Sequence, residues 1–137
     1  VVTLGASVDL NHQAQFLGIT QYFDLSRAYD TAGGITYAQP RLIWMQDGEK
    51  NKGRSVEYVR AHLKGNERPA TLADGIALAI TQPDIKSILR NHAIDLPGSS
   101  VGSDRAPHLL DWRGDLRLDH HFVDAANPLW GSASSGS

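Results

Sequence analysis

The stretch RAPHLLDWRGDLRLDHHF (residues 105–122) predicts a β-hairpin, because apolar and polar residues alternate on either side of a short turn. Asp111 at the first turn position and Gly114 at the fourth favour a type I turn. Gly114 is expected in the left-handed region, which gives a three-residue hairpin loop. We therefore expect two paired strands, near 107–112 and 115–122.

The expected register decides which histidines of the hairpin lie together. It places His108 opposite Leu118, so that His108 and His120 share one face of the sheet. His121 points to the other face, since side chains alternate along a strand. With an acid such as Asp95, His108 and His120 could bind zinc or nickel, or supply a general base. The sequence has no HExxH spacing and fixes no third ligand, so packed histidines are the favoured interpretation, and no metal ligand or catalytic residue is assigned.

The composition is typical of a globular chain. The 137 residues fit one domain, with an N-terminal helical region at 1–34 and an α+β core at 35–134. The net charge of −2 gives no general attraction to nucleic acid. The basic loop EKNKGR (49–54) is diluted by neighbouring acids, so a solvated loop is the favoured interpretation and nucleic-acid binding is not expected.

Two absences narrow the classes of protein further. The sequence has no Cys, which excludes disulfides, thiolate metal sites and a cysteine nucleophile. No apolar run approaches the roughly 20 residues that span a bilayer. We therefore expect a cytoplasmic protein that does not bind membranes, and we expect no cofactor.

Signals outside the hairpin predict an α+β fold. Short apolar segments at 41–47 and 92–96 are typical of strands. Together with the hairpin they give a small, mostly antiparallel sheet of about four strands. Helices between 55 and 90 are expected to pack on one face of this sheet, and Thr71 with Asp74 forms a capping box at the start of one of them.

The first 34 residues carry apolar positions at mostly helical spacings. We expect one helix from near Ser7 to Gly18 and a second helix that ends before Gly33. The glycines of 31–40 predict a hinge after them. These helices are expected to form a flap or a contact between two copies, so a homodimer stays open as an alternative.

The loop at 96–107 supplies further candidate binding residues. Its backbone N–H groups around Ser99 and the guanidinium of Arg105 could hold a carboxylate or phosphate. The alternative is a solvated turn in which Arg105 pairs with Asp104, with another carboxylate or with loop carbonyls. That alternative is favoured, because the loop has no known phosphate-binding pattern.

Tryptophans are expected to be core anchors or walls of a pocket. This applies to Trp44, Trp112 and Trp130. Trp130 follows the last strand, where it is expected to plug the open end of the sheet near Trp112 or Trp44.

Four segments between about residues 39 and 134 carry a resemblance to known proteins: PRLIWMQDG, RPATLADGIALAITQPDI, IDLPGSSVGSDRAPHLL and GDLRLDHHFVDAANPLWGSAS. In this order they resemble a bacterial domain family of unknown function that is frequent in actinobacteria. Near LDHHF the family carries other residues, often Trp or Cys, so the resemblance does not make the histidines a shared active site. It implies a domain boundary and a fold, but no activity.

Two classes of function remain open. The leading one is a non-catalytic binding or interaction module for a small molecule or protein, because no catalytic arrangement is fixed. The alternative is a small hydrolase or metal-assisted enzyme that uses His108 and His120. The candidate ligand-binding residues are Ser99, Arg105, His108, His120 and Trp112.

Overall fold

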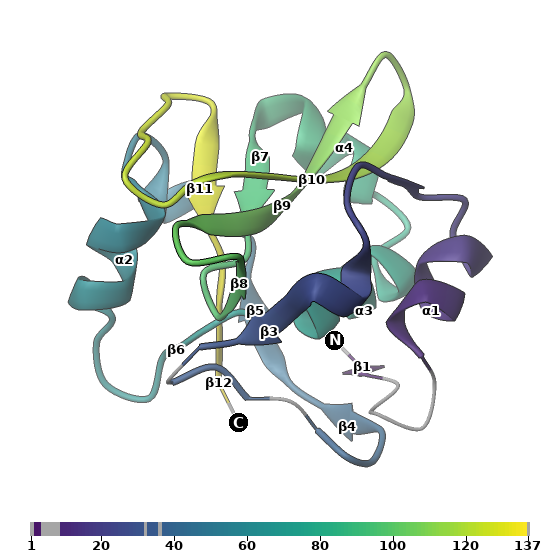
Figure 1. Ribbon diagram of the computed structural model, residues 1–137, viewed down its shortest axis with the longest axis horizontal. Helices are drawn as coiled ribbons and strands as arrows, with labels where there is room; N and C mark the ends of the chain where they lie inside the picture. The colour runs from purple at the N-terminus through teal and green to yellow at the C-terminus, as the bar shows by residue number, and fades with distance from the viewer. Residues whose placement is uncertain (1, 4–8, 32, 36, 137) are drawn as a thin grey trace.

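The computed structural model describes residues 2–3, 9–31, 33–35 and 37–136 (Figure 1). Its α-helices are α1 (Leu10–Phe16), α2 (Val56–His62), α3 (Leu72–Thr81) and α4 (Ile85–Asn91). Two short 3₁₀-helices are η1 (Leu25–Arg27) and η2 (Glu49–Asn51). The strands are β1 (Val2–Thr3), β2 (Thr20–Gln21), β3 (Ala28–Asp30), β4 (Arg41–Leu42), β5 (Trp44–Gln46), β6 (Arg68–Pro69), β7 (Ala93–Asp95), β8 (Ser99–Val101), β9 (Arg105–Trp112), β10 (Asp115–Phe122), β11 (Trp130–Ser132) and β12 (Ser134–Gly136).

A seven-stranded mixed sheet forms the largest element of the fold. Five strands run in the order β11-β7-β9-β10-β2, and β8 joins β9 to β3. The pairs β11–β7 and β10–β2 are parallel, whereas the others are antiparallel. A separate antiparallel sheet has the order β5-β12-β6. The α+β class is confirmed. The predicted sheet of about four mostly antiparallel strands was too small, because strands of two or three residues leave almost no periodicity in a sequence.

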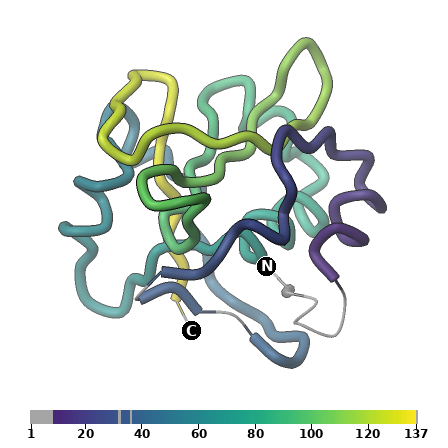
Figure 2. Tube along the Cα trace, viewed as in Figure 1, coloured from purple at the N-terminus to yellow at the C-terminus, as the bar shows by residue number. Residues whose placement is uncertain are grey.

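The N-terminal segment differs most from its prediction. Its first helix, α1, begins after Asp9, whose side chain accepts a hydrogen bond from the Asn11 N–H; the expected start near Ser7 lies outside the described residues. The second predicted helix was wrong: β2, η1 and β3 occupy its place. β2 pairs with β10, and β3 pairs with β8, so hydrogen bonds to exposed strand edges outweigh the local helical pattern. Figure 2 shows this segment, purple to dark blue, alongside the sheet instead of forming a separate flap.

The helix-start signals in the middle of the chain are confirmed. The Thr71 hydroxyl accepts from the Asp74 N–H, and the Asp74 carboxylate accepts from the Thr71 N–H, which completes the capping box of α3. Ser55 caps α2 in the same way by accepting from the Tyr58 N–H. In the part of the chain that the structure describes, no helix combines the length and hydropathy required to cross a bilayer.

The hairpin forms, but in a different register from the predicted one. Trp112 pairs with Asp115, which leaves only Arg113 and Gly114 in the loop. Both loop residues have positive φ, 53° and 88°, as a two-residue type I′ turn requires. The Asp111 side chain accepts from the Gly114 N–H at 2.8 Å and supports the turn. The shorter loop shifts the pairing by one residue, which exchanges the two faces of β10 relative to β9.

One face of the main sheet forms the hydrophobic core. Leu109 on β9 lies opposite Leu118 on β10 and Ile94 on β7, and all three side chains are fully buried. They belong to the same cluster as Leu72 and Ile76 of α3. The helices α3 and α4 therefore cover this face, and the side chains one residue along each strand point to the opposite face.

Candidate metal centre

Three neighbouring strands bring Asp95, His108 and His121 together on the face opposite the core. Asp95 on β7 lies directly across from His108 on β9. His121 on β10 lies across from Ala106, two residues from His108 and therefore on the same face. The sequence-based prediction that His108 shares its face with His120 was wrong, because the one-residue shift in register puts His121 there instead.

The polar atoms of this cluster lie at short distances. Asp95 Oδ1 is 2.7 Å from His121 Nε2 and 3.6 Å from His108 Nδ1. One candidate ligand atom from each residue lies within 4.8 Å of the other two. The side chains are nearly inaccessible, with exposed fractions of 1% for Asp95, 7% for His108 and 9% for His121. The cluster is therefore a buried, convergent set of one carboxylate and two imidazoles.

Hydrogen bonds determine the protonation of His121. Its Nδ1 lies 2.9 Å from the carbonyl oxygen of Phe122, which only accepts, so Nδ1 carries a proton. Its Nε2 faces the Asp95 carboxylate at 2.7 Å, so that nitrogen carries a proton as well. Burial lowers the pKa of His121, but the hydrogen bond and negative charge of Asp95 more than offset it, and the net pKa is raised. The Asp95 carboxylate thus favours the protonated form of His121.

Asp95 shows the complementary shift. Burial acts to raise its pKa, yet the two histidines beside it more than compensate and hold the pKa below its ordinary value. A carboxylate that stays ionised in a buried position needs positive charge next to it. In this cluster the positive charge comes either from a proton on His121 or from a bound cation that replaces that proton.

Two buried polar atoms of the cluster lack a hydrogen-bond partner within the described residues. They are Asp95 Oδ2 and His108 Nδ1. An unsatisfied buried polar atom costs about 1–3 kcal/mol, so both atoms are suited to an additional ligand. Carboxylate oxygens and imidazole nitrogens bind zinc at about 2.0–2.1 Å, which separates neighbouring ligand atoms by about 3.3 Å in a tetrahedral site. The separations of Asp95 Oδ1 from His121 Nε2 and His108 Nδ1, 2.7 and 3.6 Å, lie on either side of that value.

Trp130 covers the cluster from the neighbouring strand β11. Its ring centroid is 4.2 Å from that of His121 and 5.7 Å from that of His108. The Trp130 carbonyl accepts from the Gly53 N–H, and Gly131 contacts the backbone of Gly48, which holds β11 against the η2 loop. Trp130 therefore covers one side of the two imidazoles.

The predicted partners of Trp130 were wrong. Trp112 and Trp44 are 49% and 59% exposed, and neither is a core anchor. Trp44 instead lines a surface pocket together with Leu78 and Ile88. The indole of Trp130 packs on the histidines because β11 pairs with β7, directly beside Asp95.

His120 and Arg105 lie on the core side of the sheet, away from the cluster. Arg105 Nη1 is 3.2 Å from His120 Nδ1, and its guanidinium lies 4.3 Å over the Phe122 ring. His120 also contacts the edge of Phe23. Burial, followed by the charge of Arg105, lowers the pKa of His120. The predicted pairing of Arg105 with Asp104 was wrong, since strand pairing places His120 and Phe122 beside Arg105.

Ser99 and Trp112 also lie outside the cluster. The Ser99 hydroxyl accepts from the Leu72 N–H at 2.8 Å and donates to the Asp30 carboxylate at 2.9 Å, so it links three segments of the fold. Trp112 is at the exposed end of the hairpin, beneath the guanidinium groups of Arg113 and Arg117. Of the five predicted ligand-binding residues, the structure places His108 alone in the cluster.

Sequence reasoning missed His121 and the role of Trp130. An Arg-Gly pair read as a two-residue loop would have given the observed register and placed His108 and His121 on the same face of the sheet. The chain matches no protein-family model, no curated protein and no solved structure. Its resemblance to the actinobacterial family therefore stays a prediction.

Proposed function

We propose that the protein is a metal-binding module that holds a divalent transition-metal ion between Asp95, His108 and His121. The observation that carries this proposal is a pair of buried atoms, Asp95 Oδ2 and His108 Nδ1, that lack a hydrogen-bond partner among the described residues and lie beside the Asp95–His121 ion pair. A cation there would bind both atoms and replace the proton on His121 Nε2. Its charge would neutralise the buried carboxylate as that proton does now.

The donor set favours zinc or a neighbouring ion. Imidazole nitrogens suit Zn²⁺, Ni²⁺ and Cu²⁺, whereas Ca²⁺ and Mg²⁺ require more oxygen ligands. The hydrogen bond from His121 Nδ1 to the Phe122 carbonyl supports this function, because metal-bound histidines usually donate their other N–H to such an acceptor. This proposal specifies the ligand of a non-catalytic binding module.

Metal-assisted hydrolysis is a second candidate, supported by the number of ligands. Three protein ligands leave a fourth position of a tetrahedral ion for water, as in catalytic zinc sites. His121 then takes the role that the sequence suggested for His120. Hydrolysis of an activated ester by the zinc-loaded protein, lost in His121→Asn and retained in His120→Asn, would support this candidate; rates equal to those of free zinc would exclude it.

Calorimetric titration of metal-free protein with Zn²⁺ tests the binding proposal. We expect one ion per chain, and affinity reduced by more than about a hundredfold in His108→Asn and His121→Asn. The matched control is His120→Asn, which changes the adjacent histidine on the opposite face and should bind zinc like the unchanged chain. Equal loss in His120→Asn and His121→Asn, or no saturable binding, would contradict the proposal.

Thermal melting provides an independent readout. At a zinc concentration of 100 times Kd, binding to the folded state adds about 2.7 kcal/mol to the free energy of unfolding. The melting temperature should therefore rise with zinc and fall again with a chelator. His121→Asn should abolish this rise even where the variant is itself folded and stable.

A further inference from the structure

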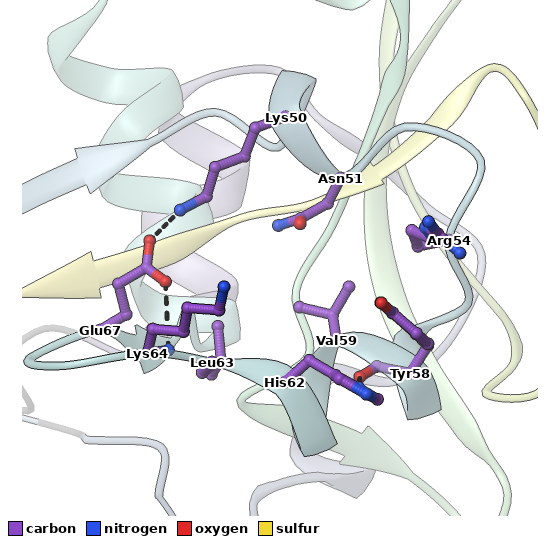
Figure 3. A pocket seen from close by; sticks show the side chains of 9 residues that line it. All are labelled: Lys50, Asn51, Arg54, Tyr58, Val59, His62, Leu63, Lys64 and Glu67. Carbon is purple, nitrogen blue, oxygen red and sulfur yellow. Dashed lines mark hydrogen bonds and ion pairs between the residues drawn. The ribbon is translucent and has the colours of Figure 1, made fainter.

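A second candidate site, separate from the metal cluster, lies between the η2 loop and α2. This basic cleft has a volume of about 360 Å³ and is formed by nine residues (Figure 3). The lining is Lys50, Asn51, Arg54, Tyr58, Val59, His62, Leu63, Lys64 and Glu67. The volume falls within the range of small-molecule sites, which is about 300–1,000 Å³.

The basic cleft carries excess positive charge in a protein whose net charge is negative. Its lining includes three Lys or Arg residues and one carboxylate, Glu67. That carboxylate is already paired, because it forms an ion pair with Lys50 and accepts from the Ser134 hydroxyl. Arg54 and Lys64 have no carboxylate partner in the described part of the chain. Two cationic groups at the cleft are therefore available to an anion.

Aromatic contacts hold one wall of the basic cleft in place. The rings of Tyr58 and His62 stack with centroids 3.9 Å apart, and the Arg54 guanidinium lies 4.6 Å over the Tyr58 ring. His62 Nδ1 lies 2.7 Å from the Tyr58 carbonyl, so it donates there and its Nε2 is left for another partner. Such stacking restricts Arg54 and lowers the entropy cost of binding a ligand.

The basic cleft also has two apolar lining residues. Val59 is buried and Leu63 is partly buried; Figure 3 shows Val59 between Lys64 and Arg54, and Leu63 beside Lys64. A ligand that fits this lining has an anionic group and a small carbon skeleton. Arg54 offers a planar pair of donors and Lys64 a point charge, a combination suited to a phosphate.

We propose that the basic cleft binds a small organic phosphate, whose anionic group is attracted by Arg54 and Lys64 and whose carbon skeleton contacts the partly buried Leu63. This site shares no side chain with the metal cluster and is independent of the proposed metal function. For the basic loop at 49–54, the sequence favoured solvated residues over contact with nucleic acid.

Amide chemical-shift mapping with phenyl phosphate tests this proposal. Protein passed over a chelating resin is used, so that bound metal does not contribute. We expect saturable shifts confined to η2, α2 and the 63–67 loop, with binding weakened about tenfold or more in Arg54→Gln and in Lys64→Gln. Lys86→Gln, which removes an exposed lysine of α4, is the control and should leave the affinity unchanged.

Two further probes distinguish the chemistry. Inorganic phosphate should bind more weakly than phenyl phosphate, because it lacks the carbon skeleton. Benzoate should bind more weakly as well, because it lacks the phosphate dianion. Shifts outside the cleft, affinity unchanged in Arg54→Gln and Lys64→Gln, or benzoate binding as tight as that of phenyl phosphate would overturn the proposal.

Discussion

The capping carboxylate Asp74 gives a quantitative prediction about stability and pH. Asp74 is 1% exposed; its Oδ2 accepts from the Thr71 N–H at 2.9 Å, whereas its Oδ1 is buried without a hydrogen-bond partner in the described structure. Burial raises the pKa of Asp74 from 3.8 to about 6, and the nearby charge of Asp30 adds to the rise. The carboxyl group therefore keeps its proton more strongly in the folded state than in the unfolded chain.

The sign of the pH effect follows from this difference. Below about pH 4 the group is protonated in both states and costs nothing. Between about pH 4 and pH 6 the unfolded chain releases the proton while the folded chain retains it, so the free energy of unfolding falls as the pH rises. A difference of about 2 pKa units corresponds to about 3 kcal/mol in the free energy of unfolding. This contribution to stability is fully lost above about pH 6 to 7.

Replacing Asp74 with Asn isolates this contribution. The amide oxygen can still accept from the Thr71 N–H, but the side chain no longer titrates. The difference in the free energy of unfolding between Asp74→Asn and the unchanged chain should shift by about 3 kcal/mol in favour of the variant from pH 3 to pH 8. Urea unfolding followed by tryptophan fluorescence measures it at each pH. Asp124→Asn, which changes an exposed carboxylate, is the control, and a constant difference for Asp74→Asn would refute the reasoning.

Two further predictions concern the backbone. Arg113 has φ of 53°, which Asn adopts more readily than Ala, so Arg113→Asn should be more stable than Arg113→Ala by about 1 kcal/mol in urea unfolding; equal stabilities would contradict the type I′ turn. A Cβ on Gly131 would overlap the carbonyl oxygen of Gly48, so Gly131→Ala should lower the free energy of unfolding by about 1–3 kcal/mol. A variant that melts like the unchanged chain would show that β11 and the η2 loop do not lie in contact.

Local signals in this sequence predicted local structure well. The Thr71 and Asp74 pair marked the start of α3, because a capping box needs only residues three positions apart. Alternation marked both strands of the hairpin, whose side chains repeat with period two. The opposite orientations of His120 and His121 followed from that alternation and are confirmed.

Features that depend on distant pairing were not predictable in the same way. The strand β2 forms because its backbone meets the edge of β10, about 100 positions further along the chain, and two residues carry no period of their own. The register of the hairpin depended on whether Arg113 adopts positive φ, which is uncommon outside glycine. Because the predicted register was wrong by one residue, the predicted site contained His120 in place of His121. Its other two members, Asp95 and His108, were named correctly.

Long-range ¹H–¹⁵N correlation of the histidine side chains tests the metal centre most directly, because it reports each ring nitrogen separately. The chain contains six histidines, so every ring can be assigned. Zinc should shift His108 Nδ1 and His121 Nε2 to metal-bound values while His121 Nδ1 keeps its proton and His120 stays unchanged. If saturating zinc instead shifts the nitrogens of His120, or leaves those of His108 and His121 unaltered, the proposed centre is wrong.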